Sequence, residues 1–140
     1  MAHPGSALTG IQTAIYSALS TDGTLTGLCT VVGDIADDTA YPFVFVGTAT
    51  EKPWNTMGGV ASGFGAECTV TCHVYSRYAG DFEALGILNR VKLLLDHVTL
   101  TVSGWNTVLC ELDEARVLLE YPQKVEQRHI AARFLVRMHQ

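Results

Sequence analysis

The sequence has 140 residues, of which 48% are hydrophobic and only 16% are charged, and its formal net charge is −5 at pH 7. This length suits one domain, so we expect residues 1–140 to share a single core. A net negative chain is unsuited to binding nucleic acid through bulk positive charge. No segment reaches the roughly 18 apolar residues of a membrane span, and no signal peptide is visible. We therefore expect a chain without a membrane partner, made in a cytosol that keeps its cysteines reduced.

The first predicted element is a helix over about residues 8–20, after a loose N-terminus at residues 1–6. Leu8, Ile11, Ile15 and Leu19 repeat at the spacing of one helix face. A polar turn ends this helix. The apolar stretch at residues 25–32 then predicts a short turn that leads into a brief strand.

A strand over residues 43–50 and a long exposed loop over residues 51–64 follow. The strand is apolar on both faces at its start, which favours cover on both sides. The loop contains Trp54, Met57 and Phe64, which a flexible linker would not need. The pattern predicts either a loop that contacts a partner, which we favour, or a hairpin tip that folds back on its own domain.

The next strand, over residues 65–78, alternates apolar and polar side chains. Cys68 and Cys72 point to its apolar face. Four residues along a strand span roughly 13 Å, which is too far for two ligands of one zinc ion. We therefore interpret these cysteines as core residues rather than as a metal site or part of a disulfide framework.

Asp81 begins the second predicted helix, in which Phe82, Leu85, Leu88 and Val91 follow a helical period. Residues 100–103 and 107–112 predict two strands around a turn, and Asp113 and Glu114 predict a bulge before the strand resumes. The last strand alternates clearly to residue 138. Together these elements predict an α+β fold, with a mainly antiparallel sheet and two helices packed on one face.

The sequence offers no catalytic, metal or cofactor motif. It has no nucleophile elbow, no phosphate-binding loop and no paired histidines at helical spacing. His73 and His129 could meet if their strands pair, but we interpret them as solvated or interface residues. We therefore expect no enzyme activity and no cofactor.

Charged residues concentrate on the last two long strands. Glu111 and Asp113 form an acidic cluster, and Arg128, Arg133 and Arg137 form a basic one. The acidic residues predict a solvated strand face or an ionic contact with a neighbouring subunit. The arginines predict either protection of an exposed sheet edge by charge or ion pairs between subunits. The half from Met1 to Ser76 has one cation, Lys52, against six carboxylates, whereas eight cations balance eight carboxylates in the rest.

The whole chain resembles the tail terminator, or tail completion, family of tailed bacteriophages. The stretches that carry this resemblance are ordered along the chain, and together they cover nearly all of it. They are the amphipathic opening at residues 11–19, the Pro-initiated strand at 41–47, the glycine-rich loop with Trp54, the strand end and helix start at 73–85, and the final hairpin at 115–136.

The resemblance implies a structural virion protein that forms a ring, usually hexameric, on the last ring of the tail tube. Such a ring ends tube polymerisation and joins the tail to the head-closure or neck protein, while genomic DNA passes through its lumen without specific binding. The family has no catalytic residues. The alternatives are another neck component, such as a head-closure or adaptor protein, a tail-tube subunit, or a small ligand-binding domain or enzyme of the host.

Overall fold

The computed structural model describes residues 5–35, 39–53 and 65–139. These residues form the following elements in chain order: α1 (Leu8–Ser20), α2 (Gly23–Thr26), β1 (Thr30–Val32), β2 (Phe43–Pro53), β3 (Gly65–Ser76), α3 (Phe82–Leu95), β4 (Val98–Thr99), β5 (Thr107–Glu120), the 3-10 turn η1 (Pro122–Lys124) and β6 (Gln127–His139). Within this part of the chain no helix is long and apolar enough to cross a membrane.

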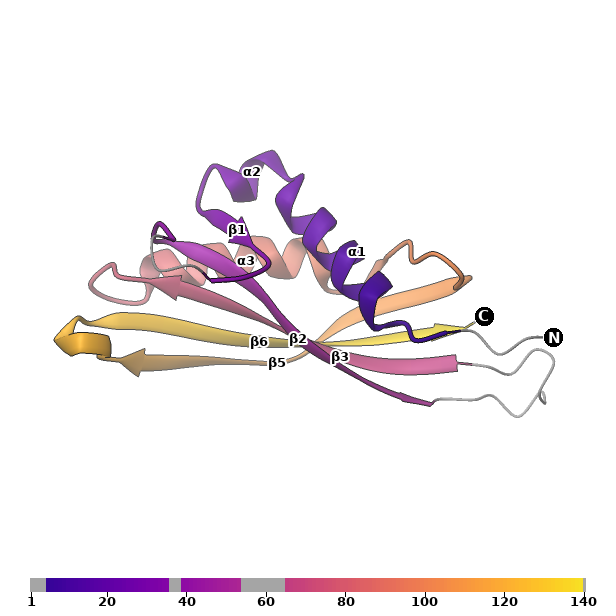
Figure 1. The fold of residues 1–140 in the computed structure, drawn as a ribbon. Helices are drawn as coiled ribbons and strands as arrows, with labels where there is room; N and C mark the ends of the chain where they lie inside the picture. Colours follow the sequence, from indigo (N-terminus) through magenta and orange to yellow (C-terminus); the bar gives the residue numbers. More distant parts are fainter. Residues whose placement is uncertain (1–4, 36–38, 54–64, 140) are drawn as a thin grey trace.

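The six strands form one twisted sheet in the order β1-β2-β3-β6-β5-β4. β1 pairs with β2 in parallel, and the remaining neighbours pair antiparallel. The α+β class is therefore confirmed, and the sheet is mixed. Figure 1 shows the β5–β6 hairpin projecting at one end of the sheet, while β2 and β3 project at the other end.

The centre of the sheet is the antiparallel pair of β3 and β6. Their register joins twelve residue pairs, from Gly65 and His139 to Ser76 and Arg128. Alternate residues are buried along β3 from Ala66 to Ser76 and along β6 from Ile130 to Met138, and Cys68 and Cys72 lie fully buried in the core. The prediction that these two cysteines are core residues is confirmed. We call the buried side of the sheet its inner face and the opposite side its outer face.

Helices α1 and α3 contribute the rest of the core. Ile11, Ile15 and Leu19 of α1 are fully buried and belong to the same apolar cluster as the inner face of β3 and β6. The buried stripe of α3 is Ala84, Ile87, Val91 and Leu95. This stripe corrects the predicted helix face, because Phe82 is 84% exposed and Leu85 is 40% exposed.

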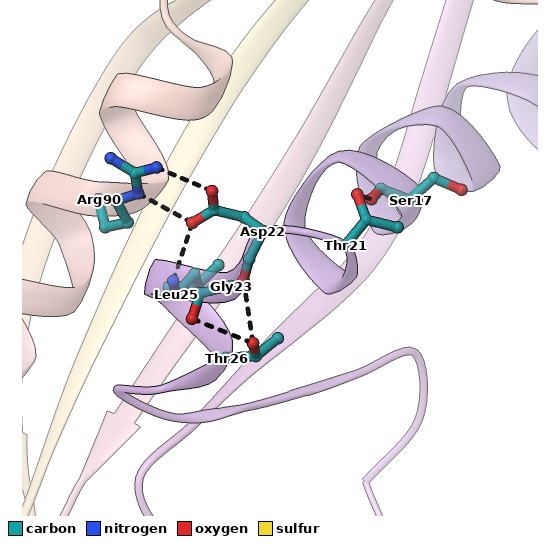
Figure 2. A network of polar contacts seen from close by, with 7 residues as sticks. All are labelled: Ser17, Thr21, Asp22, Gly23, Leu25, Thr26 and Arg90. Atoms are coloured by element: carbon teal, nitrogen blue, oxygen red, sulfur yellow. Dashed lines mark hydrogen bonds and ion pairs between the residues drawn. The ribbon is translucent and has the colours of Figure 1, made fainter.

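A third helix, α2, corrects the prediction of two helices. It lasts a single turn, and Asp22 makes it possible by accepting a hydrogen bond from Leu25 N at 2.8 Å as an N-cap. The same carboxylate receives both Nε and Nη2 of Arg90 on α3, at 2.9 and 2.8 Å. Figure 2 shows this side chain joining the α1–α2 turn to α3. The two guanidinium contacts, followed by the Leu25 bond, lower the pKa of Asp22 to about 2.

Three boundaries also differ from the sequence-based expectations. β2 continues to Pro53, so residues 51–53 belong to a strand rather than to the predicted loop. In the N-terminal segment Ser6 donates a hydrogen bond to Glu51 at 2.8 Å, which ties residue 6 to β2. The strand predicted over residues 100–103 is instead β4 at Val98–Thr99, and the apolar residues Leu100 and Val102 are buried in the core outside any strand.

We predict opposite effects for alanine at two glycines. A Cβ on Gly47 of β2 would lie 2.7 Å from the carbonyl oxygen of Thr71 on the neighbouring strand, whereas nothing lies within 4 Å of a Cβ on Gly86 in α3. Gly47→Ala should therefore lower the free energy of unfolding by about 1–3 kcal/mol through overpacking.

The matched control, Gly86→Ala, should raise that free energy by up to about 1 kcal/mol, because alanine is the better helix former. Chemical denaturation of both variants measures the two changes. A Gly47→Ala variant as stable as the parent would contradict the close approach of β2 and β3.

Candidate functional site

The predicted interface residues fall into two groups. Trp54, Met57 and Phe64 lie outside the described residues, so their role stays a prediction. Glu111, Asp113, Arg128, Arg133 and Arg137 lie on β5 and β6 or in the bulge between their paired stretches. Their contacts show what these charged residues do within one chain.

One charged group on the outer face centres on Glu67 of β3. Its carboxylate lies 3.0 Å from Lys52 Nζ on β2 and accepts a hydrogen bond from Arg137 Nε on β6 at 3.1 Å. These two hydrogen bonds lower the pKa of Glu67. Arg137 also lies 4.0 Å from Glu111 of β5. The group therefore connects four neighbouring strands across the sheet.

A second charged group surrounds Arg133, and it depends on the predicted bulge. The register of β5 and β6 shifts between Leu112 and Glu114, which confirms a bulge at Asp113. Arg133 Nε donates to Asp113 at 2.8 Å, and its Nη2 donates to Glu114 at 3.3 Å. The ion pairs that the sequence suggested between subunits thus form here within one chain.

Arg128 lies apart from the other two arginines, on the inner face of β6 opposite Ser76. Its guanidinium contacts Asp81 and Glu126, each at 2.6 Å, and its side chain is only 14% exposed. Asp81 precedes α3 but makes no capping hydrogen bond. Its carboxylate instead joins the start of α3 to the β5–β6 hairpin.

His73 and His129 meet on the outer face, as the sequence allowed. His73 Nδ1 lies 2.7 Å from His129 Nε2, and His129 Nδ1 lies 3.1 Å from Glu120 Oε2. Because a carboxylate only accepts, His129 Nδ1 donates to Glu120, and the neutral His129 accepts the proton of His73 Nδ1. Gln127 donates to the other Glu120 oxygen at 3.0 Å.

Aromatic rings surround this pair and complete a row across β2, β3 and β6. Tyr75 stacks on His129 at 4.4 Å and on Phe43 at 4.9 Å, while Phe45 stacks on His73 at 5.7 Å. Burial lowers the pKa of His73, and the neighbouring His129 lowers it further. Burial raises the pKa of Glu120, but its hydrogen bonds from His129 and Gln127 outweigh this effect and lower it overall.

The contacts of these groups are structural. His73 Nδ1 and His129 Nε2 contact each other, and His129 Nδ1 contacts Glu120. Three of the four ring nitrogens of the pair therefore take part in contacts within this group. Among the described residues no cluster of three or more His, Cys, Asp or Glu side chains could hold a metal ion. The ion pairs, the histidine pair and the stacked rings stabilise the outer face of the sheet.

An exposed apolar surface is the feature that the sequence did not reveal. Phe82 and Tyr78, which is 53% exposed, line a depression of about 310 Å³ with Leu28, Glu83, Gly86 and Ile87. The helical period placed Phe82 in the core. Its position at the first residue of α3, directly after Asp81, is the signal that could have placed it outside.

Comparisons with known proteins give one family and one fold. A family model described as Tail completion protein gp17 matches residues 13–139. A chain of the solved structure titled "Virion of native gene transfer agent (GTA) particle" has a TM-score of 0.78 and 21% sequence identity. The match covers 97% of this chain and 100% of that one. No curated protein sequence matches the chain.

We predict that acid weakens the fold through the histidine pair. The folded pKa of His73 lies below its ordinary value of 6.5, so its stabilising contribution is complete above pH ~6.5 and is lost as the pH falls through the folded pKa. Glu120, whose pKa is also lowered, adds a loss in the same direction below about pH 4.5. The free energy of unfolding should therefore fall between pH 7.5 and pH 5.

The control separates this pair from other histidines. His73→Gln should show a smaller loss of stability over that range, whereas His97→Asn, at a side chain 72% exposed, should keep the loss of the parent. Urea denaturation at several pH values measures both variants. Equal pH dependence in the parent and His73→Gln would exclude the pair as the cause.

Proposed function

Since this chain belongs to the Tail completion protein gp17 family, we propose that it closes the phage tail as a ring of six copies. As a member of that family it is a structural protein of the virion tail or neck and not an enzyme. In our proposal the ring binds the last ring of tail tube protein, ends tube polymerisation and joins the tail to the head-closure or neck protein.

The family match over residues 13–139 is the observation that carries this proposal. The match spans nearly all of the described structure, from α1 to β6. The similarity to a chain of a gene transfer agent virion supports the fold. The ring itself and its stoichiometry are inferred from the family resemblance in the sequence.

The distribution of exposed apolar side chains supports a ring. A closed ring with one subunit type needs two different complementary surfaces on each copy. Tyr16 and Ile35, which are 40% and 44% exposed, lie on the β1 side of the sheet. Leu93 and Leu109, which are 71% and 40% exposed, lie on the β4–β5 side. The two sheet edges therefore offer distinct apolar surfaces to neighbouring copies.

The charge of the chain supports a lumen that DNA crosses without binding. The net charge of −5 repels the phosphate backbone. On the described outer face Lys52, Arg133 and Arg137 are each paired with carboxylates. Cations neutralised in this way provide few contacts for DNA phosphates.

Two other roles remain alternatives for the same fold. Another neck component, such as a head-closure or adaptor protein, would bind the head side but would not stop tube growth. A tail-tube subunit would polymerise into long tubes on its own. A host ligand-binding domain or enzyme would need a pocket with convergent polar groups, and the family assignment argues against it.

We predict that the chain stops tube growth. Purified tail tube protein that polymerises without the chain should give tubes of uncontrolled length, and adding the chain should give shorter tubes with a ring at one end. Negative-stain microscopy measures tube length and end structure. Long tubes made by the chain alone would favour the tube-subunit alternative, and unchanged tube length would favour another neck role.

We further predict that the segment between β2 and β3 is needed for docking. Deleting residues 54–63, or the single change Trp54→Ala, should abolish or reduce the joining of tails to heads. Far-ultraviolet circular dichroism should show the parent's secondary structure for Trp54→Ala, since Trp54 lies beyond the last residue of β2. Phage yield from a complementation assay measures the effect, and an unchanged yield would contradict the proposed docking role.

A further inference from the structure

Residues 113–120 of strand β5 have an unpaired backbone edge on the side away from β6 in the described part of the chain. β4 pairs only with Leu109 and Cys110 of β5. Leu112 N donates to Asp96 Oδ1 at 2.7 Å, which covers the edge as far as the bulge. In the described part of the chain no strand pairs with residues 113–120 on the side away from β6. About eight residues of β5 therefore present backbone groups that another strand can pair with.

Four of the eight side chains along this edge are charged, but two apolar side chains near its end are exposed. Val117 is 41% exposed and Leu119 is 51% exposed, although both lie on the inner face opposite Ile130 and Arg128. Tyr121, just beyond the strand, is 61% exposed. Proteins usually shield a long edge with lysine, proline or a covering loop, because an open edge recruits other strands. The exposed apolar side chains of Val117 and Leu119 beside an open edge favour a strand partner.

Among the described strands, β5 of a second copy is the best match for this edge. β1 has only three residues, Thr30–Val32. The free part of β2 is blocked, because its register shifts between Val46 and Ala49, Gln12 donates to Gly47 O at 3.0 Å, and the strand ends at Pro53, which has no N–H. Only β5 offers an open edge of matching length.

The charges and the exposed apolar side chains of β5 together favour one antiparallel register with itself. If Leu118 faces Leu118 of the second copy, then Arg116 faces Glu120 of the second copy, and Val117 faces Leu119 of the second copy. Both contacts occur twice by symmetry. A register centred on Val117 would oppose Glu114 and Glu120, and one centred on Arg116 would oppose two arginines. A register centred on Ala115 would also pair Glu114 with Arg116, but it would set Asp113 against Val117. Opposite charges across a strand pair stabilise it, and like charges destabilise it.

Arg116 and Glu120 are both accessible enough to make this contact. The Arg116 side chain is 67% exposed, and its 3.3 Å contact with Glu114, itself 48% exposed, lies at the surface. Glu120 is 39% exposed while its carboxylate is held by His129 and Gln127. The histidine pair therefore fixes the acceptor that Arg116 of the second copy would meet.

We propose that the free chain forms a two-fold dimer through residues 116–120 of β5, paired antiparallel about Leu118, and that this contact shields the outermost part of the open edge. The dimer goes beyond the proposed ring, because a two-fold contact uses the same surface on both copies and a head-to-tail ring does not. The partner is a second copy of this chain.

Light scattering coupled to size-exclusion chromatography tests the dimer. The full-length chain should elute with a mass near twice 15.1 kDa. Arg116→Glu places like charges opposite Glu120 of the second copy, and Leu119→Lys places an edge-protecting lysine in the contact. Each variant should raise the dimer dissociation constant roughly tenfold or more.

Lys92→Glu, at an exposed position on α3, is the matched control for the change in charge and should leave the dimer unchanged. A monomer at all concentrations would overturn the proposal, and so would an oligomer insensitive to Arg116→Glu and Leu119→Lys or weakened equally by Lys92→Glu. The tube-growth assay on Arg116→Glu keeps the two ideas separate, since a monomeric variant that still stops tubes leaves the ring intact.

Discussion

The antiparallel pairing of β3 with β6 is the constraint on which the rest of this structure depends. Its register decides at once which side chains of both strands form the inner face and which form the outer face. If β3 slipped by one residue, its two sets of side chains would exchange faces, and Glu67 and His73 would enter the core. The buried alternation from Ala66 to Ser76 makes such a slip costly, so the position of every outer-face group follows from one pairing.

Several polar side chains of the outer face are already bonded to partners within their own chain. Arg133 and Arg137 bind carboxylates of their own chain, and His129 is held between His73 and Glu120. These contacts order long side chains before any partner arrives, which lowers the entropy cost of binding.

The sequence predicted the features that depend on local periodicity, and it missed those that depend on the position of neighbouring elements. The alternation in β3 and β6 placed Cys68 and Cys72 in the core, and the acidic pair at residues 113–114 identified the bulge. The helical period wrongly predicted that Phe82 is buried, because burial at the first residue of a helix depends on how the preceding loop enters the helix. The split between Arg128 and the other two arginines follows from strand parity, which already placed Arg133 and Arg137 on one shared face; the structure adds the partners of each. The free edge of β5 depends on how short β4 is, which no pattern within β5 reveals.

The burial of the cysteines has a consequence for a protein that leaves the cell in a virion. Assembly takes place in a reducing cytosol, whereas a released particle meets an oxidising environment. Burial raises the pKa of Cys72 and Cys110 to about 12, and that of Cys29 and Cys68 to about 11. Thiols in this state are almost entirely protonated and react slowly with oxidants. The four sulfur atoms of this chain can therefore remain ordinary core atoms in both environments.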